Sequence, residues 1–466
     1  MYSAARRAWR KKPARGPSWG GLGIDTHASG DTVAADEARS RRRNAAIKGA
    51  FFSEVIDMFD IYLPVVVLTP IMGYFQPAQS DPSTAAILAS FVFITTLLGR
   101  PLGSLLFGRV ADRIGRRRAT LFSVVGFSVI TLAIGLIPGY HSIGIWSYVL
   151  LAGLRFLDGI CLGGGYTGAI PLALESAEKR HRGFVGGFIL SGFCVAYIAI
   201  NLVAMAMYAL FPADGLDSPY ARFGWRIPFF IGAALGGVLA FYYLRHVEES
   251  EIWQTETAGG ARALPMTALF RGAAGRNLLQ VLVMMTGFWT TQNLIALYLP
   301  SVLLPQTLAL SKEHVSLTLL VTYTCLFFSY IAAGLLGQRL GRRRAFLLIA
   351  PAIATLGAGM LYTLTTAAGW PLPAVMLLTA ALAILVTAPW GIIVTYINER
   401  FATDLRATGF GVGFSLSVVV TSFYAVYLRW LEGPFGAAAP VALLCIGAAL
   451  ATLGAWLGPE TREVDL

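Results

Sequence analysis

Long apolar segments recur along almost the whole of this 466-residue chain, and they limit its fold more than any other feature. About 20 consecutive apolar residues cross roughly 30 Å of hydrocarbon as a helix. Because lipid offers the backbone no hydrogen-bonding partner, spanning segments of this length must be helical. Apolar residues make up 56% of the chain and charged residues only 13%, which fits a soluble protein poorly. We therefore predict an all-α polytopic membrane protein.

The hydropathy pattern predicts twelve transmembrane helices. They occupy residues 46–74, 84–107, 118–138, 146–174, 183–211, 226–244, 277–300, 315–336, 345–364, 373–397, 408–429 and 436–458. Arginine and lysine collect before the first span and in the even-numbered gaps, as in "GRVADRIGRRR" and "GQRLGRRR". This distribution indicates an inner-membrane protein with both termini in the cytoplasm. It also accounts for the net charge of +11 without nucleic-acid binding.

Two pairs of elements indicate an internal duplication. The loop segments that begin at Gly108 and Gly334 are 226 residues apart (334 − 108), and Glu175 and Glu399 are 224 apart (399 − 175). Six helices per copy would relate the copies by an axis along the membrane normal. We predict a disordered basic cytoplasmic tail (1–44), a six-helix bundle (45–244), a cytoplasmic linker (245–276), a second six-helix bundle (277–458) and a short cytoplasmic tail (459–466).

Several of these segments resemble a known family. "GRVADRIGRRR" is similar to the loop motif of major facilitator superfamily transporters, and the resemblance extends over nearly the whole chain from about residue 45. "DMFDIYL", "RPLGSLLFG" and "RFLDGICLGGGYTGA" resemble the first, second and fourth helices of its metabolite:proton symporter branch. "GWRIPF" and "PETR" fit that branch and the related sugar porters. In one departure, Gly163, Gly164 and Gly165 stand where the branch usually has Gly-Gly-Glu.

Charged residues within the predicted spans, away from the span ends, are confined to the first half of the chain. They are Glu54, Asp57, Asp60, Arg100, Arg155 and Asp158. Such charges are costly in hydrocarbon and normally mark function. Counting 1.5 Å per residue from the helix ends places Asp60 and Arg155 near the midplane. A spacing of three puts Asp57 with Asp60, and Arg155 with Asp158, on single helix faces, so we expect the two faces to meet.

These charges suggest proton coupling. Burial raises the pKa of a carboxyl and a nearby arginine lowers it, so a carboxyl that gains and loses an arginine neighbour can carry a proton. We hypothesise that Asp60 or Asp57 takes up the proton with Arg155 as partner, and the resemblance implies the same first-helix and fourth-helix positions. Asp158 and Arg100 complete the coupling set. The alternative is a lattice of ion pairs that only holds the helices together.

Glu54 and the polar residues of other spans are assigned different roles. We expect Glu54 to be a solvated entrance residue near the cytoplasmic surface. Substrate would lie near the midplane between the repeats. The candidate substrate-binding residues are Tyr166, Thr167, Asn201, Trp289, Gln292, Asn293 and Tyr298. For each of these the alternative is an ordinary interhelical hydrogen bond or aromatic packing.

The loop motif and its surroundings predict a gate. The candidate gating residues are Gly108, Asp112, Arg113, Gly115, Arg116, Glu175, Arg182, Arg339, Arg342, Glu399 and Arg406. The resemblance implies that Asp112 faces the other half near the start of the eleventh span and latches the cytoplasmic side shut. Gln338 replaces this acid in the second copy, so we expect a weaker latch there. The alternative is a topology signal without a part in gating.

Other kinds of site are not indicated. Cys161, Cys194, Cys325 and Cys445 lack metal-ligand spacing, and no histidine lies inside a span away from its ends. We therefore expect no metal, no cofactor and no enzyme activity. The sequence predicts a monomeric secondary transporter that imports a small polar metabolite (an organic acid, zwitterion or osmolyte) with protons by alternating access, in contact with lipid and not with nucleic acid. The alternatives are a proton-coupled exporter and a non-transporting membrane sensor.

Overall fold

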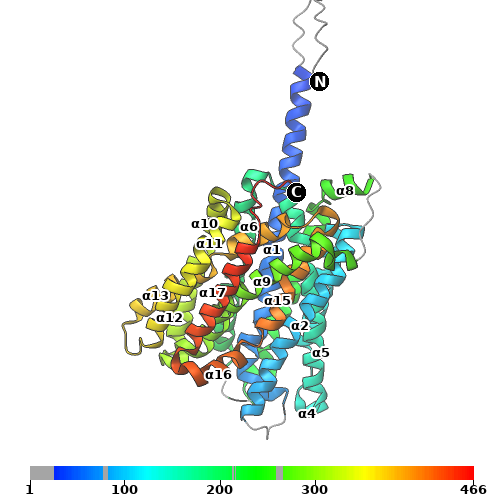
Figure 1. The fold of residues 1–466 in the computed structure, drawn as a ribbon. Helices are drawn as coiled ribbons and strands as arrows, with labels where there is room; N and C mark the ends of the chain where they lie inside the picture. Colours follow the sequence, from blue (N-terminus) through cyan, green and yellow to red (C-terminus); the bar gives the residue numbers. More distant parts are fainter. Residues whose placement is uncertain (1–25, 77–81, 213–214, 216, 259–265) are drawn as a thin grey trace, which may run out of the picture. The chain divides into compact units, whose positions relative to one another are not determined.

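The computed structural model describes residues 26–76, 82–212, 215, 217–258 and 266–466. Every regular element in these ranges is helical, as the hydropathy pattern predicted (Figure 1). Nine helices of the described chain are long and apolar enough to cross a membrane. The first, seventh and eleventh predicted spans are helical as well but fall outside this group. The first contains three acids, and the other two each divide into two shorter helices.

We call residues 42–258 the first half of the chain. Helix α1 begins before residue 42 and is described with this half. The elements are α1 (Thr26–Val67), η1 (Thr69–Tyr74), α2 (Pro82–Ile114), α3 (Arg116–Gly135), α4 (Tyr140–Ile143), α5 (Trp146–Ser176), η2 (Lys179–His181), α6 (Arg182–Leu210), η3 (Tyr220–Gly224), α7 (Arg226–His246) and α8 (Glu251–Ala258). Residues 26–44, which we predicted to be disordered, are helical. Four alanines and four arginines in this stretch favour helix.

The second half, here residues 266–466, contains helices that are more often interrupted. They are η4 (Met266–Phe270), α9 (Gly272–Asn293), η5 (Leu294–Thr307), α10 (Lys312–Leu340), α11 (Arg342–Ala352), η6 (Ile353–Gly357), α12 (Ala358–Thr365), α13 (Leu372–Thr387), α14 (Trp390–Glu399), η7 (Thr403–Leu405), α15 (Arg406–Thr421), α16 (Tyr424–Phe435), η8 (Gly436–Ala438) and α17 (Ala439–Leu457). Several interruptions coincide with proline, which removes a helical hydrogen bond. Pro300 and Pro305 lie in η5, and Pro389 separates α13 from α14.

Close helix packing in the first half depends on small residues. Helix α2 packs along α5, and Gly99 and Gly103 of α2 face Gly159 and Gly163 of α5. A Cβ atom at any of the four would collide with backbone of the partner helix. Glycine lets helix backbones approach closely in a membrane, so this pair forms a rigid unit. The same helix α2 packs on α15 of the second half, and α6 packs on α10.

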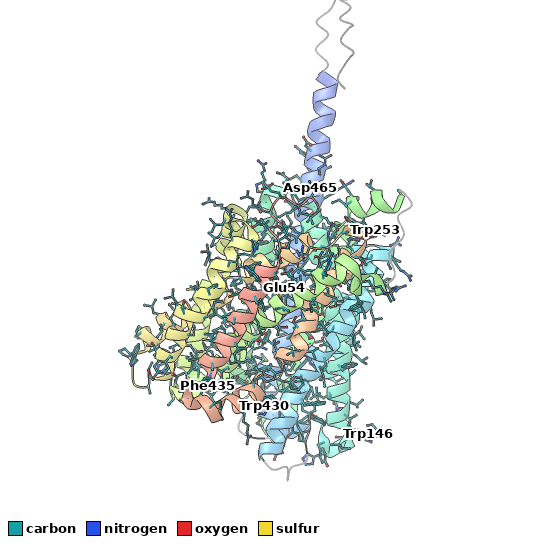
Figure 2. The ribbon with its side chains drawn as sticks, in the orientation of Figure 1. Glu54, Trp146, Trp253, Trp430, Phe435 and Asp465 are labelled. Carbon is teal, nitrogen blue, oxygen red and sulfur yellow. The ribbon has the colours of Figure 1, made fainter. Side chains whose placement is uncertain are left out.

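The two ends of the helix bundle differ, and we name them here. The motif end carries the α2–α3 and α10–α11 loops, whose Gly115 and Gly341 adopt left-handed φ angles of 106° and 97°. The opposite end carries α4 and α16 (Figure 1). Figure 2 places Glu54 in the middle of the bundle, between Trp253 and Asp465 near the motif end and Trp146 and Trp430 near the opposite end.

Candidate functional site

The acidic face of α1 meets the charged face of α5, as the residue spacing predicted. Arg155 Nη1 donates to Asp158 Oδ2 at 2.7 Å and to Asp60 Oδ2 at 3.2 Å. Thr131 of α3 donates to the other oxygen of Asp60 at 2.8 Å. The three charged side chains are at most 3% exposed. One guanidinium is therefore shared by two buried carboxylates, an arrangement that places a proton-binding group next to a competing cation.

A second charged group on α1 and α2 lacks such pairing. Arg100 acts electrostatically on Glu54 and Asp57, and its guanidinium lies 4.8 Å from the ring centre of Tyr166. Within the described chain, both oxygens of Asp57, Oε1 of Glu54 and two nitrogens of Arg100 have no hydrogen-bond partner. Buried polar groups without partners are costly. A proton or a ligand at this group would satisfy atoms that the described chain leaves unpaired.

Gly165 leaves space for Asp57. A Cβ atom at this glycine would lie 2.7 Å from Asp57 Oδ2. The one residue of the three that differs from the related branch therefore faces the acidic side of α1, and even an alanine at position 165 would displace the carboxylate. At Gly163 and Gly164 an added Cβ would instead collide with the Arg100 backbone and the Phe107 ring. Close packing accounts for those two glycines.

The expectation that Glu54 lies near the surface is wrong. Its side chain is 3% exposed, and it shares one face of α1 with Met58 and Tyr62 because they follow at intervals of four residues. These three side chains line a central pocket between the two halves of the chain. Counting residues gives only the position along the helix, and Glu54 is buried because its side chain faces the second half of the chain across the pocket.

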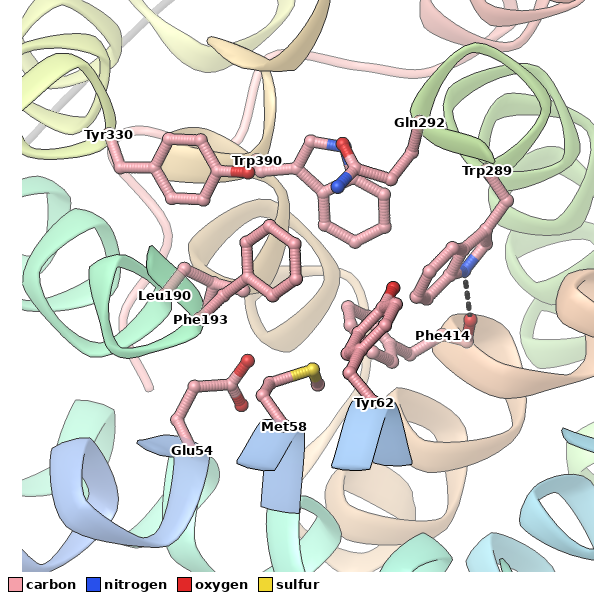
Figure 3. Close-up of a pocket in the computed structure, with 10 residues that line it drawn as sticks. All are labelled: Glu54, Met58, Tyr62, Leu190, Phe193, Trp289, Gln292, Tyr330, Trp390 and Phe414. Carbon is pink, nitrogen blue, oxygen red and sulfur yellow. Dashed lines mark hydrogen bonds between the residues drawn. The ribbon is translucent and has the colours of Figure 1, made fainter. Parts of the chain in front are cut away.

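The central pocket is small and mostly aromatic (Figure 3). Its volume of about 20 Å³ has room for one water molecule. The first half of the chain contributes Glu54, Met58, Tyr62, Leu190 and Phe193, and the second half contributes Trp289, Gln292, Tyr330, Trp390 and Phe414. A metabolite would fit only after the lining side chains or helices move apart.

Two of the seven predicted substrate residues, Trp289 and Gln292, line this pocket. The other five, Tyr166, Thr167, Asn201, Asn293 and Tyr298, are not among its lining residues. Four of them have local or interhelical partners. These are Ser104 Oγ for Tyr166 (2.6 Å), Gly164 O for Thr167 (2.8 Å), Tyr197 O for Asn201 (2.8 Å) and Thr421 O for Asn293 (2.8 Å). For these residues the structure favours the alternative of ordinary hydrogen bonding or packing.

The internal repeat contained a signal for one residue that the sequence analysis missed. Trp390 is 224 residues after Tyr166 (390 − 166), the same offset that relates Glu175 to Glu399. The singled-out tyrosine therefore has a tryptophan counterpart, and it is this counterpart that reaches the pocket. For Leu190, Phe193, Tyr330 and Phe414 no such signal exists, because apolar residues fill every span.

At the motif end, Asp112 connects the two halves. Its carboxylate accepts from the backbone N–H groups of Ala407 (3.3 Å) and Thr408 (3.2 Å) and from the Thr408 hydroxyl (2.6 Å). These residues begin α15, where the helix dipole favours negative charge. Gly108 allows this approach, since a Cβ there would lie 2.7 Å from Thr408 Cα. In the second copy, Gln338 Oε1 accepts from Gly183 N near the start of α6 at 3.0 Å. The uncharged copy therefore makes the corresponding contact, with one backbone donor instead of two.

The glutamates of the gating set also have partners at this end. Glu175 Oε1 accepts from Arg116 (3.0 Å) and from Arg406 of the other half (2.8 Å). Glu399 accepts from Arg342 at 3.2 Å. Arg182 donates to the Val464 carbonyl at 2.9 Å. Arg113 and Arg339 are exposed. The motif end is thus closed by contacts that cross between the halves.

Two glutamates to which the sequence analysis gave no role, one of them in the segment "PETR", cap the helices after the loop motifs. Glu249 accepts from the backbone N–H of Arg116 at 2.8 Å, and Glu460 accepts from that of Arg342 at 2.8 Å. The next residues, Ser250 and Thr461, donate to Glu175 and Glu399. The pairs Glu249-Ser250 and Glu460-Thr461 therefore make equivalent contacts in the two halves. A search for repeated residue pairs at a second sequence offset, beside 224 and 226, would have found them.

A wider cavity lies toward the opposite end. Its volume is about 720 Å³, and it lies between the two halves of the chain. Its walls come from α1, η1 and α2 on one side and from η5, the α15–α16 turn and α16 on the other, including Leu68, Phe93, Leu297, Tyr424 and Arg429. Tyr62 of the central pocket contacts Phe93 of this cavity, with ring centres 6.2 Å apart. The central pocket is therefore separated from this cavity by few side chains, and from the motif end by the contacts described above.

Helices long enough to span a membrane, buried charges, and a cavity toward the end opposite the loop motifs define a class, the polytopic membrane transport proteins. Residues 50–425 match the Major Facilitator Superfamily, and the chain belongs to this family. The fold is therefore that of twelve transmembrane helices in two six-helix repeats, and the related proteins are transporters and not enzymes.

Curated relatives cover most of the chain. The inner membrane metabolite transport protein YhjE of Escherichia coli K12 is 26% identical over 91% of this chain and 96% of its own length. The proline/betaine transporter of the same strain is 29% identical, over 86% of this chain and 79% of its own. Its alpha-ketoglutarate permease is 27% identical, over 85% and 90%. The chain is thus similar to proteins named for quite different metabolites.

Solved structures agree on the fold. The proton:xylose symporter XylE bound to 6-bromo-6-deoxy-D-glucose superposes with a TM-score of 0.72, at 16% identity, over 92% of this chain and 99% of that one. A double tryptophan mutant of XylE gives a TM-score of 0.73 at 17% identity, over 91% and 98%. At such identities the likeness concerns the fold alone.

Proposed function

We propose that this protein is a proton-coupled symporter that imports a small polar metabolite by alternating access. The observation that carries the proposal is the buried Asp60–Arg155–Asp158 cluster, in which one guanidinium bonds two carboxylates. In this proposal a proton binds Asp60 when the helices move and Arg155 turns to Asp158 alone. Release of Arg155 is coupled to the change of access because Asp60 lies on the same helix as the pocket residues Met58 and Tyr62.

The topology belongs to the same proposal. We place the motif end and both termini in the cytoplasm of an inner-membrane protein, so the 720 Å³ cavity would open to the outside. Residues 45–244 and 277–458 would be the moving bundles, joined by a cytoplasmic linker at 245–276 and followed by a short cytoplasmic tail at 459–466. In support, the caps Glu249 and Glu460 make equivalent contacts at corresponding places in the two halves. We propose that one chain suffices for transport.

Relatives support the coarse substrate class. They include proteins named for proline and betaine and for alpha-ketoglutarate, so small zwitterions, osmolytes and organic acids are the compounds to test first. The buried Arg100 and the buried acids of α1 are compatible with a charged metabolite, and hydrogen-bonding residues such as Gln292 with a polar one.

Transport into proteoliposomes under an imposed pH gradient tests this function. We expect acid outside to drive uphill uptake of proline, glycine betaine or alpha-ketoglutarate, with proton entry that follows substrate entry. Net movement of the compound only out of the vesicles under the same gradient would indicate an exporter. Binding without exchange of labelled compound in a counterflow assay would indicate a sensor and would contradict the proposal.

A further inference from the structure

The central pocket has an unusual combination of groups. Three of its aromatic rings, those of Trp289, Trp390 and Phe414, are mutual neighbours with ring centres 4.5, 5.6 and 5.8 Å apart and interplanar angles of 69°, 75° and 86°. At these distances the rings pack edge to face against one another, and their remaining faces and edges line the pocket. The Trp289 ring is held in place because its Nε1 donates to Phe414 O at 2.9 Å (Figure 3).

The polar groups of the pocket are not saturated. Oε1 of Glu54, Oε1 of Gln292 and Nε1 of Trp390 have no hydrogen-bond partner within the described chain, and their residues are only 3%, 4% and 3% exposed. Two of these three atoms are acceptors. Since buried polar atoms are normally paired, their number points to a ligand that supplies mainly positive charge or donors.

Glu54 is the acidic residue of the pocket. It is the one charged residue among the described residues that line it. Arg100 also acts on Glu54, but its guanidinium lies over the Tyr166 ring and Arg100 is not part of the lining. A cation between the ring faces would interact with both the carboxylate and the π-electrons. Cation–π contacts are strongest when they are desolvated, as they would be here.

We infer that the substrate carries an ammonium group, which binds among Trp289, Trp390 and Phe414 with Glu54 as its counter-charge. This inference rests on the proposed transport function and narrows its substrate class to zwitterions and organic cations with a positively charged nitrogen. A sugar or a simple organic anion would leave the carboxylate uncompensated. Because the pocket now holds about 20 Å³, the substrate enters from the wider cavity as Tyr62 and its neighbours move aside.

Isosteric probes on the purified full chain test the inference. Glycine betaine and 3,3-dimethylbutanoate have the same shape, but the second has carbon in place of the positive nitrogen. We expect glycine betaine, or proline as a second ammonium probe, to raise the melting temperature and to exchange in counterflow. We expect 3,3-dimethylbutanoate and D-xylose to do neither.

Variants locate the binding group. Trp390→Leu should weaken binding of the ammonium probe about tenfold or more, the loss expected for a desolvated cation–π contact. Glu54→Gln keeps the size of the side chain and should weaken it as well. Trp370→Leu changes a tryptophan that is 44% exposed and is the matched control. If Trp390→Leu does not fold, Glu54→Gln and the comparison of glycine betaine with 3,3-dimethylbutanoate still test whether the pocket binds an ammonium group.

The outcomes separate this inference from the proposed function. Equal binding of 3,3-dimethylbutanoate, binding of D-xylose or alpha-ketoglutarate alone, or no binding of any ammonium probe would overturn the inference. Ammonium exchange in counterflow that no pH gradient can drive uphill would leave the inference standing and contradict proton coupling. Proton-driven uptake of alpha-ketoglutarate without binding of any ammonium probe would support proton coupling and overturn the inference about the substrate.

Discussion

At the residue scale, the three acids of α1 differ in what surrounds them. Asp60 bonds Arg155 and Thr131, Asp57 faces Gly165 without a hydrogen-bond partner in the described chain, and Glu54 lines the pocket. Helix geometry causes this, because positions 54 and 60 are about 120° apart around the helix, with position 57 between them. We therefore assign the proton to the side of α1 that faces α5 and the substrate to the side that faces the second half.

Substitution of Asp60 tests that assignment. In Asp60→Asn the Arg155 guanidinium keeps only Asp158 as a charged partner, and position 60 no longer binds and releases a proton. We expect proton-driven accumulation to fall at least tenfold while counterflow, which needs no net proton movement, continues. Both are measured in the same proteoliposomes.

Asp217→Asn is the control, since the Asp217 side chain is fully exposed. Full proton-driven accumulation by Asp60→Asn would show that this carboxylate does not carry the proton. Loss of counterflow together with accumulation would instead indicate that the side chain is needed for the fold or for binding.

At the scale of elements, the α2–α5 pair supports the charged site. Arg100 lies on α2, and Arg155 and Asp158 on α5, so close packing of these two helices fixes the distance between the two charged groups. The four glycines that allow this packing leave no space for a methyl group. The glycines at this interface therefore affect function by setting how closely the charged helices approach, and not by any chemistry of their own.

Gly163→Ala should disturb this pair. The added Cβ would collide with the backbone oxygen of Arg100, and overpacking of this kind costs about 1–3 kcal/mol. We expect a lower melting temperature for the purified protein in detergent. Gly153→Ala on the same helix has no atom within 4 Å of the added Cβ, and it should leave the melting temperature unchanged or raise it. Equal effects of the two variants would show that the α2–α5 contact is looser than described.

At the scale of the whole molecule, the contacts between the halves are concentrated at the motif end. Three contacts close this end: Asp112 accepts from the start of α15, Gln338 accepts from the start of α6, and Glu175 accepts from Arg406. The 720 Å³ cavity lies toward the other end. Contacts that form in one state only bias an equilibrium between states. These contacts favour the state in which the motif end is closed.

Asp112→Asn should shift that equilibrium. The amide keeps one acceptor oxygen but loses the charge that favours the N-terminus of α15. We expect a cysteine introduced at Ser301, which lines the wide cavity, to react more slowly with a membrane-impermeant maleimide in the Asp112→Asn background. Glu178→Gln, on an exposed pair at the same end, is the control and should not change the rate. An unchanged rate in Asp112→Asn would favour a pure topology signal.

The class of fold, the helical spans and the repeat could be predicted from the amino-acid pattern alone, because lipid permits few alternatives for long apolar segments. The meeting of Asp60 and Arg155 could be predicted as well, since spacing along a helix fixes which residues share a face. The packed structure was needed to show that Glu54 faces a pocket, that Trp390 and Phe414 lie beside Trp289, and that Glu249 and Glu460 cap the helices after the loop motifs. Those contacts join residues more than 100 positions apart, and their partners are common residue types without a local pattern. Such neighbours follow from how whole helices pack, which no short stretch of sequence specifies.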